Sequence, residues 1–192
     1  MIYGKRGTGK TILIDHILSK SNPMCSLIFS NSKEYDKYTE SKTSYVEIYQ
    51  DFDSTKLRDH LDYFQLCASV YNVNSRGNLV VLDDSVVTVK NDTQLKWLFL
   101  NGRFIQTGLI LTNQGGYNLP TALRQNIDYV FIFRDHDVRR LYEQYAGIFP
   151  TIEQFQSTLE KYTNNYGCLV IDNTSNSNQL EDRIFHYKVP RV

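Results

Sequence analysis

The chain has 192 residues, enough for one α/β domain with a substantial buried core. Its 21 basic and 21 acidic residues cancel, so a role in handling DNA would need a local basic surface or a ring of subunits that focuses charge. No run of about 18 apolar residues occurs, and the widely spaced Cys25, Cys67 and Cys168 are typical of core thiols in a reducing compartment. We therefore expect a soluble, intracellular protein.

Residues 4–11 match the phosphate-binding pattern G-x-x-x-x-G-K-[ST] at all four specified positions. The glycines Gly4, Gly7 and Gly9 allow a tight turn that brings backbone N–H groups to phosphate oxygens. Lys10 supplies a positive charge for the β- and γ-phosphates, and Thr11 offers a hydroxyl to Mg²⁺. The residues expected to bind the nucleotide are Gly4, Lys5, Arg6, Gly7, Thr8, Gly9, Lys10 and Thr11, with Arg6 on the solvent side. A chance glycine-rich turn is disfavoured because a helical pattern follows at once, so the chain is predicted to bind a nucleoside triphosphate.

The start of the chain is unusual, since only Met1, Ile2 and Tyr3 precede the first glycine of this loop. A phosphate loop normally follows a buried strand of about five or six residues. We expect that the chain is truncated at its N-terminus or begins with an unusually short first strand.

The remaining pattern alternates strands and helices. Strands are expected at 26–30, 45–49, 79–82, 109–113, 129–133, 168–171 and 183–187, helices at 11–19, 54–71, 92–106, 120–125, 136–146 and 151–163, and a surface insertion at 31–44. This alternation predicts a single domain over residues 1–192, of the α/β class, with a mostly parallel central sheet covered by helices on both faces. The polar stretch 172–182 can join the last two strands in a C-terminal hairpin.

A pair of acids ends the apolar run at residues 79–82. Asp83 is expected to hold Mg²⁺, directly or through water, and Asp84 to polarise the attacking water as general base. Many motor ATPases have Glu at the second position, and Asp is one methylene shorter. The alternative is that both residues simply end a strand, where Asp is common in turns.

Gln114 and three arginines are further candidates. Gln114 follows the next strand and can orient water or contact the γ-phosphate, or it is a turn residue before Gly115. Arg103, Arg124 and Arg134 can each act in trans on the transferring phosphoryl group, or can be surface or salt-bridge residues. Arg103 ranks first because it ends the helix between the two strands that carry the acids and Gln114.

Five segments now stand out along the chain, in the order GKRGTGKT, NLVVLDDS, NGRFIQTGLILTNQ, LPTALRQNIDYVFIFR and LYEQYAGIFP. In order and spacing they resemble the DNA-packaging ATPases of large double-stranded DNA viruses and their virophages, a poxvirus-type branch of the FtsK–HerA superfamily of ring translocases. The resemblance covers the chain from Gly4 to Tyr187, and Leu119 to Pro150 is its most diagnostic part.

The resemblance implies a P-loop ATPase that uses ATP and Mg²⁺ to thread viral double-stranded DNA into preformed capsids. The implied partners are double-stranded DNA, further copies of the chain in a homo-oligomeric ring, and a capsid or portal-vertex protein. The implied location is the assembly site in the host cytoplasm, with the virus particle as an alternative. The family positions match Lys10, Thr11, Asp83, Asp84, Gln114 and Arg103, whereas the first strand is nearly missing and Phe104 stands where His is more usual.

Other functions remain open alternatives. A P-loop kinase is disfavoured because no arginine-rich lid segment is seen, and a GTPase because residues 112–115 lack the Lys and Asp of an N-K-x-D element. A non-catalytic nucleotide-binding assembly subunit is disfavoured by the intact Lys10, Thr11 and Asp83. Some lysines can face a DNA pore, although a solvated surface accounts for them equally well: Lys33, Lys37, Lys42, Lys90 and Lys96.

Overall fold

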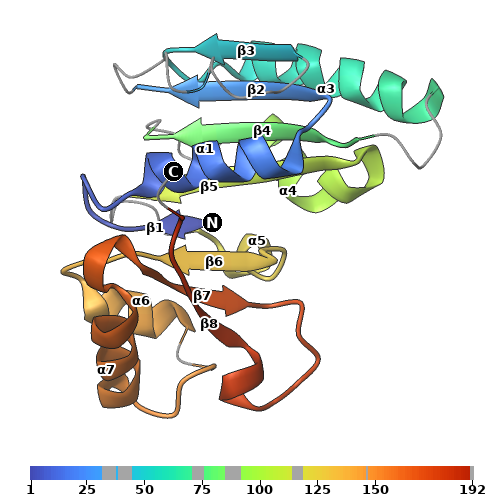
Figure 1. The fold of residues 1–192 in the computed structure, drawn as a ribbon. Helices are drawn as coiled ribbons and strands as arrows, with labels where there is room; N and C mark the ends of the chain where they lie inside the picture. The colour runs from blue at the N-terminus through green and yellow to red at the C-terminus, as the bar shows by residue number, and fades with distance from the viewer. Residues whose placement is uncertain are drawn as a thin grey trace. The chain divides into compact units, whose positions relative to one another are not determined.

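The computed structural model describes residues 1–31, 38, 45–70, 76–84, 92–113, 119–145 and 147–190, without the side chains of residues 67 and 68. The chain divides into two compact units (Figure 1). The first unit contains Met1–Leu13, Asn113–Gly116 and Ile127–Val192, and the second unit contains Ile14–Thr112 and Tyr117–Asn126.

The second unit is built on parallel strands in the order β3-β2-β4-β5. Their bounds are Cys25–Ser30 for β2, Tyr45–Tyr49 for β3, Asn78–Asp83 for β4 and Thr107–Asn113 for β5, whose last residue belongs to the first unit. Every residue of β2 and β4 is buried, as expected for central strands of an α/β sheet. The register pairs Ser30 with Asp83, so the carboxyl end of β4 meets that of β2 at one edge.

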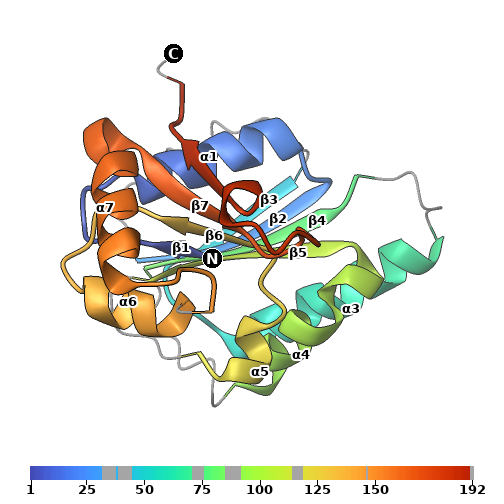
Figure 2. The same ribbon diagram turned by 90° about the horizontal axis from the view of Figure 1, so that it is seen from below.

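Helices cover both faces of the strands in the second unit. Helix α1 spans Lys10–Ser21, and its part from Ile14 onward lies on one face, whereas α3 (Ser54–Val70) and α4 (Thr93–Asn101) lie on the other (Figures 1 and 2). The predicted helix at residues 54–71 is confirmed as α3, and its apolar residues Leu57, Leu61 and Phe64 are all buried. The 3₁₀ turn η1 (Gly102–Ile105) follows α4, and the short helix α5 (Thr121–Arg124) begins after Pro120.

The start of α4 follows the sequence prediction. Asp92 is its N-cap, and the Asp92 carboxylate accepts a 2.8 Å hydrogen bond from the backbone N–H of Leu95. The cap satisfies one of the N–H groups that a helix leaves without a partner in its first turn. The cap therefore fixes where the segment leading to Arg103 begins.

The first unit combines parallel and antiparallel strands in the order β1-β6-β7-β8. Strand β1 (Ile2–Tyr3) pairs in parallel with β6 (Tyr129–Ile132), β7 (Cys168–Asp172) is antiparallel to β6, and β8 (Ile184–Tyr187) is antiparallel to β7. The other elements are α6 (Val138–Tyr145), α7 (Ile152–Tyr162) and the 3₁₀ turns η2 (Asn164–Tyr166) and η3 (Leu180–Asp182). The predicted α/β class, the mostly parallel pairing and the C-terminal hairpin are confirmed.

Aromatic rings and thiols fill the cores of the two units. In the first unit the rings of Phe149 and Phe155 meet edge to face at 5.0 Å, and in the second unit Phe29 stacks on Tyr49 at 5.8 Å. Cys25 and Cys168 are buried, as predicted for core thiols, and burial raises the pKa of Cys168 to about 12. The side chain of Cys67 lies outside the described residues.

The predicted surface insertion at residues 31–44 is wrong at Tyr38. Of this stretch the structure describes Asn31, which is exposed, and Tyr38, which is completely buried. Burial of the Tyr38 ring away from water stabilises the fold, and the Tyr38 hydroxyl donates a hydrogen bond to the Asp83 carboxylate inside the second unit. Within the described ranges, no helix has the length and apolar character needed to cross a membrane.

Candidate active site

The phosphate loop connects β1 to α1 in the first unit (Figure 1). The backbone N–H of Gly4 donates to the carbonyl of Asn113 at 3.2 Å, and that of Lys5 donates to the carbonyl of Arg134 at 3.4 Å. The beginning of the loop is thus attached to the last residue of β5 and to the segment that leaves β6. Arg6 is exposed, which confirms its expected position on the solvent side.

Two glycines of the loop are required for different reasons. Gly4 has φ +151°, and a Cβ atom there would lie 2.7 Å from the Cβ of Phe133 and 2.9 Å from the Oγ1 of Thr8. Gly7 has φ +76°, and a Cβ atom there would meet nothing within 4 Å, so only its backbone conformation requires glycine. The pattern of glycines therefore reflects close packing at Gly4 and a left-handed turn at Gly7.

The Lys10 side chain lies inside the loop, with 5% of its surface exposed. Its ammonium group donates to the carbonyl oxygens of Gly4 at 2.9 Å and Lys5 at 3.0 Å. The hydroxyl of Thr8 also donates to the Lys5 carbonyl, at 2.8 Å. A buried ammonium is stabilised by such partners, and phosphate oxygens would add the negative charge that carbonyl dipoles lack. The loop therefore positions the Lys10 ammonium group where an anion can bind. Thr11, which is half-buried, follows it in the first turn of α1.

The Asp83 carboxylate is held at the end of β4 in the second unit, where only 1% of the residue is exposed. Its Oδ1 accepts a 3.1 Å hydrogen bond from the hydroxyl of Thr112, and its Oδ2 accepts a 2.5 Å hydrogen bond from the hydroxyl of Tyr38. These two donors restrict the orientation of the carboxylate, whose oxygen atoms are ligands of the type that Mg²⁺ prefers.

Asp84 adopts a left-handed backbone conformation, with φ +52°. Its N–H donates to the Thr112 hydroxyl at 2.9 Å, so one threonine holds both acids. In the described part of the chain, the Oδ1 atom of Asp84 is buried and accepts no hydrogen bond. Because such an atom is costly to bury alone, it fits a water molecule or a cation. Within the second unit, the carboxylate oxygens of Asp83 and Asp84 are the ligand type that Mg²⁺ prefers.

The remaining predicted residues fall into different places. Arg103 lies exposed on η1 and Arg124 ends α5, both in the second unit, whereas Arg134 is exposed in the first unit. The Arg124 guanidinium donates to the hydroxyl of Thr121 at 3.0 Å, which is a local surface contact. Gln114 lies outside the described residues. The structure thus groups the loop residues in one unit and the paired acids in the other.

Sequence reasoning missed two partners of the acids. Thr112 is one of two polar residues that end the apolar strand β5. This change from apolar to polar residues at the end of a strand could have identified Thr112 as a candidate site residue. Tyr38 is separated from Asp83 by 45 positions within a polar stretch, so no local pattern points to it.

The chain is similar to proteins of several viruses over nearly its full length. It is 32% identical to protein 088R of Invertebrate iridescent virus 3, over 98% of this chain and 74% of the relative. It is 30% identical to protein 015R of Frog virus 3, over 99% of this chain and 61% of that relative. No family model matches the chain.

Solved structures share the fold. The genome packaging NTPase B204 from Sulfolobus turreted icosahedral virus 2, in complex with AMPPCP, matches 97% of this chain and 95% of B204 with a TM-score of 0.66 and 16% identity. EssC (ATPases 2 and 3) from Geobacillus thermodenitrificans matches 74% of this chain and 33% of EssC with a TM-score of 0.54 and 17% identity. The chain therefore shares the fold of B204, as the resemblance predicted, and it belongs to the viral protein family that includes protein 088R of Invertebrate iridescent virus 3.

Proposed function

We propose that this chain hydrolyses ATP and uses the free energy to move viral double-stranded DNA into preformed capsids. The observation that carries the proposal is the built phosphate loop, in which a buried lysine is held by two loop carbonyls. The similar protein B204 is a genome packaging NTPase with complexes of AMPPCP and ATP-γ-S, which supports ATP as the nucleotide.

In this proposal the loop binds the phosphates. The N–H groups of residues 4–11 surround the β- and γ-phosphates, and the ammonium of Lys10 moves from the loop carbonyls to phosphate oxygens. Thr11 and Asp83 hold Mg²⁺, which when bound neutralises charge that develops on the phosphoryl oxygens. Tyr38 and Thr112 keep the Asp83 carboxylate in one orientation while it does so.

Two consecutive residues of β5 form the hydrogen bonds that hold the acidic pair and the start of the phosphate loop. Thr112 holds Asp83 and Asp84, and the next residue, Asn113, accepts from Gly4 of the phosphate loop. Helix α1 likewise begins in the loop and continues into the second unit. The peptide bond between Thr112 and Asn113 and the continuous helix α1 thus link the two groups along the chain. This continuity supports the assignment of the loop and the acids to one reaction.

Hydrolysis requires a water molecule that loses a proton. Asp84 accepts that proton as the water attacks the γ-phosphorus, and the bond to the bridging oxygen breaks to give ADP and phosphate. Its buried Oδ1, which accepts no hydrogen bond from the described residues, supports this role because water is a natural donor to it. Gln114 orients the water, and Arg103 of a neighbouring copy stabilises the charge of the transferring group.

The wider assembly follows from the motor role. We propose a homo-oligomeric ring around double-stranded DNA, docked on a capsid or portal-vertex protein at the assembly site in the host cytoplasm. The chain has no net charge, so attraction to DNA requires a local basic surface. A ring would bring the basic surfaces of several copies together around the DNA and strengthen the local positive potential. Arg103 lies exposed on η1, where a neighbouring subunit can reach it.

Removal of the loop lysine tests the enzymatic claim. We expect Lys10→Ala to lower ATP hydrolysis at least about a hundredfold, because a preorganised charge at the phosphates is lost. Circular dichroism should show that the fold is retained, and Lys20→Ala, an exposed lysine in the last turn of α1, should hydrolyse ATP like the unchanged chain.

Two results would contradict the proposal. Undiminished turnover by the Lys10→Ala protein would show that the phosphate loop is not the site. Binding of ATP by the unchanged chain without any turnover, with DNA and at high protein concentration, would favour a non-catalytic assembly subunit.

A further inference from the structure

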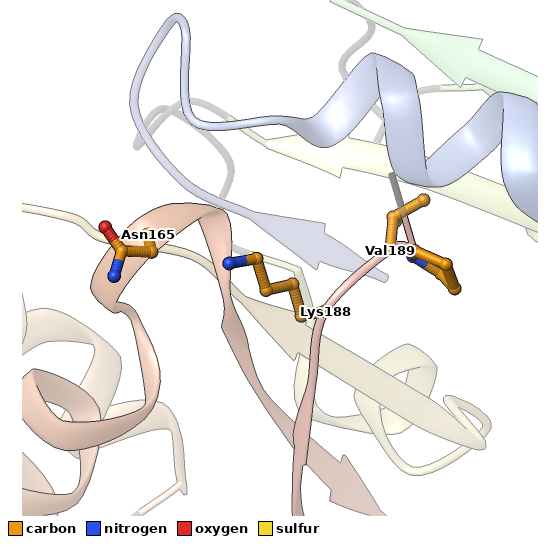
Figure 3. Close-up of a pocket in the computed structure, with 4 residues that line it drawn as sticks. Asn165, Lys188 and Val189 are labelled. Atoms are coloured by element: carbon orange, nitrogen blue, oxygen red, sulfur yellow. The ribbon is translucent and has the colours of Figure 1, made fainter. Parts of the chain in front are cut away.

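A solvent-open pocket of about 550 Å³ lies in the first unit, outside the residues assigned so far. It is lined by Asn165 of η2 and by Lys188, Val189 and Pro190, which follow β8. Figure 3 shows Lys188 extending from the C-terminal segment toward the turn that carries Asn165. The volume is within the range of small-molecule sites, about 300–1,000 Å³, and the lining combines an amide, an ammonium group and apolar atoms.

The same turn contacts the phosphate loop through Tyr166. A Cβ atom at Gly9 would lie 3.8 Å from the Cδ1 of Tyr166, so the tyrosine ring lies against the loop at a position where glycine leaves room for it. Tyr166 is nevertheless 59% exposed, which leaves most of its surface available to a ligand. The pocket and the phosphate loop are therefore neighbours within one unit.

The turn is held in an uncommon conformation by its surroundings. Asn165 and Tyr166 are consecutive left-handed residues, with φ +51° and +63°. A Cβ atom at Gly167 would lie 2.5 Å from the Tyr162 carbonyl and 2.7 Å from the Nε2 of His186, so the turn packs closely on α7 and β8. The rings of Tyr162 and His186 also lie 5.4 Å apart. The turn that carries Asn165 and the strand that precedes Lys188 are thus packed against each other. This packing maintains the unfavourable backbone conformation of Asn165 and Tyr166.

We propose that this pocket binds the base and ribose of the nucleoside triphosphate whose phosphates bind the loop. This inference rests on the proposed function. A nucleobase has flat apolar faces and a polar edge, and Val189 and Pro190 in the pocket offer apolar surfaces for the faces. The exposed ring of Tyr166, the chain neighbour of the lining residue Asn165, offers a further stacking surface beside the phosphate loop. The amide of Asn165 can both donate to and accept from the base edge, and Lys188 can donate to a ring nitrogen or a ribose hydroxyl.

The test compares ATP with inorganic tripolyphosphate, which carries the phosphates without base or ribose. Calorimetric titration in Mg²⁺ should show that the unchanged chain binds ATP at least about tenfold more tightly than tripolyphosphate. Tyr166→Asn should weaken ATP binding about tenfold and leave tripolyphosphate binding unchanged, because asparagine tolerates the left-handed backbone but lacks the ring. Tyr166→Phe keeps the ring and should retain the preference for ATP.

Two further variants sharpen the test. Asn165→Gly removes the amide at a position where glycine accepts the positive φ, and should also reduce the preference for ATP. Tyr63→Asn changes a tyrosine of similar exposure on α3, in the second unit, and should bind both ligands as the unchanged chain does.

The outcomes separate this inference from the proposed function. If the unchanged chain binds both ligands equally, or if Tyr166→Asn and Asn165→Gly keep the full preference for ATP, the base pocket is wrong and the phosphate loop stands. If Tyr166→Asn weakens both ligands equally, the tyrosine only supports the loop and the inference is again overturned. If the unchanged chain binds neither ligand, the proposed function fails together with the inference.

Discussion

At the scale of single residues, the orientation of one carboxylate connects packing to chemistry. Asp83 is almost completely buried, and its two oxygens accept hydrogen bonds from Tyr38 and Thr112. Hydrogen bonds to a charged acceptor are among the strong ones in proteins, so these donors restrict the carboxylate to one rotamer. Tyr38 is therefore a positioning residue for the proposed Mg²⁺ ligand.

We predict that Tyr38→Phe raises the Mg²⁺ concentration for half-maximal ATP hydrolysis by roughly threefold or more. The ring still fills the core, but the carboxylate loses the hydrogen bond from the Tyr38 hydroxyl, which helps to fix its orientation. A titration of Mg²⁺ at saturating ATP measures the shift, with Tyr63→Phe as the matched exposed control. An unchanged Mg²⁺ dependence with a lowered Tm would reduce Tyr38 to a purely structural role.

The phosphate loop and the acidic pair could be predicted from the sequence because their chemistry lies in short, contiguous motifs. Lys10 is recognised by the glycines around it, and Asp83 by the apolar run that it ends. Tyr38 could not be predicted, because its value depends on a contact 45 positions along the chain. Tyr166 was equally hidden, since its approach to Gly9 depends on how β7 returns beside β6.

At the scale of elements, Glu47 on the edge strand β3 forms a polar contact with His60 on α3. Tyr45, Glu47 and Tyr49 alternate along the strand and share a face. Glu47 accepts hydrogen bonds from the hydroxyls of Tyr45 and Tyr49, and its Oε2 lies 3.2 Å from the Nε2 of His60 on α3. These bonds, led by that of Tyr45, lower the pKa of Glu47 below its ordinary value of 4.5.

We predict that Glu47→Gln lowers the free energy of unfolding at pH 7 and that this difference shrinks below pH 4.5. A carboxyl whose pKa is lowered by folding stabilises the protein above its unfolded pKa, and this contribution is lost as the pH falls through the folded value. Urea unfolding between pH 7 and pH 3 measures the difference, with exposed Glu181→Gln as control. A difference that does not vary with pH would contradict the assignment.

The regular elements could largely be predicted, because helical and alternating apolar patterns are local. The structure extends α1 from Lys10 to Ser21 and ends α4 at Asn101, where η1 takes over. The strand pair β7 and β8 also follows from two apolar runs joined by a polar stretch. The turn η2 could not be predicted, since consecutive left-handed residues at Asn165 and Tyr166 are imposed by packing on α7 and β8.

At the scale of the whole molecule, the two units are interleaved along the chain. The backbone passes from one to the other after residues 13, 112, 116 and 126, and α1 and β5 each contribute residues to both units. Each unit is thus made of segments that are separated along the chain. We therefore keep the sequence prediction of a single domain as a proposal.

We predict that denaturant unfolds both units in one transition. Trp97 is the single tryptophan of the chain and lies on α4 in the second unit, so its fluorescence reports on that unit, whereas far-ultraviolet circular dichroism reports on both. The two probes should give the same midpoint and slope in urea. A separate circular-dichroism transition without a change in Trp97 fluorescence would show that the units unfold independently.

The central claim is that this chain is a DNA-dependent motor, and ATP turnover with and without double-stranded DNA tests it most directly. Measured over a series of protein concentrations, turnover should rise several-fold with DNA and more than linearly with protein, because neighbouring copies complete each site. The Lys10→Ala protein should show neither response. Turnover that is the same with and without DNA at every concentration would contradict the account and favour a P-loop kinase.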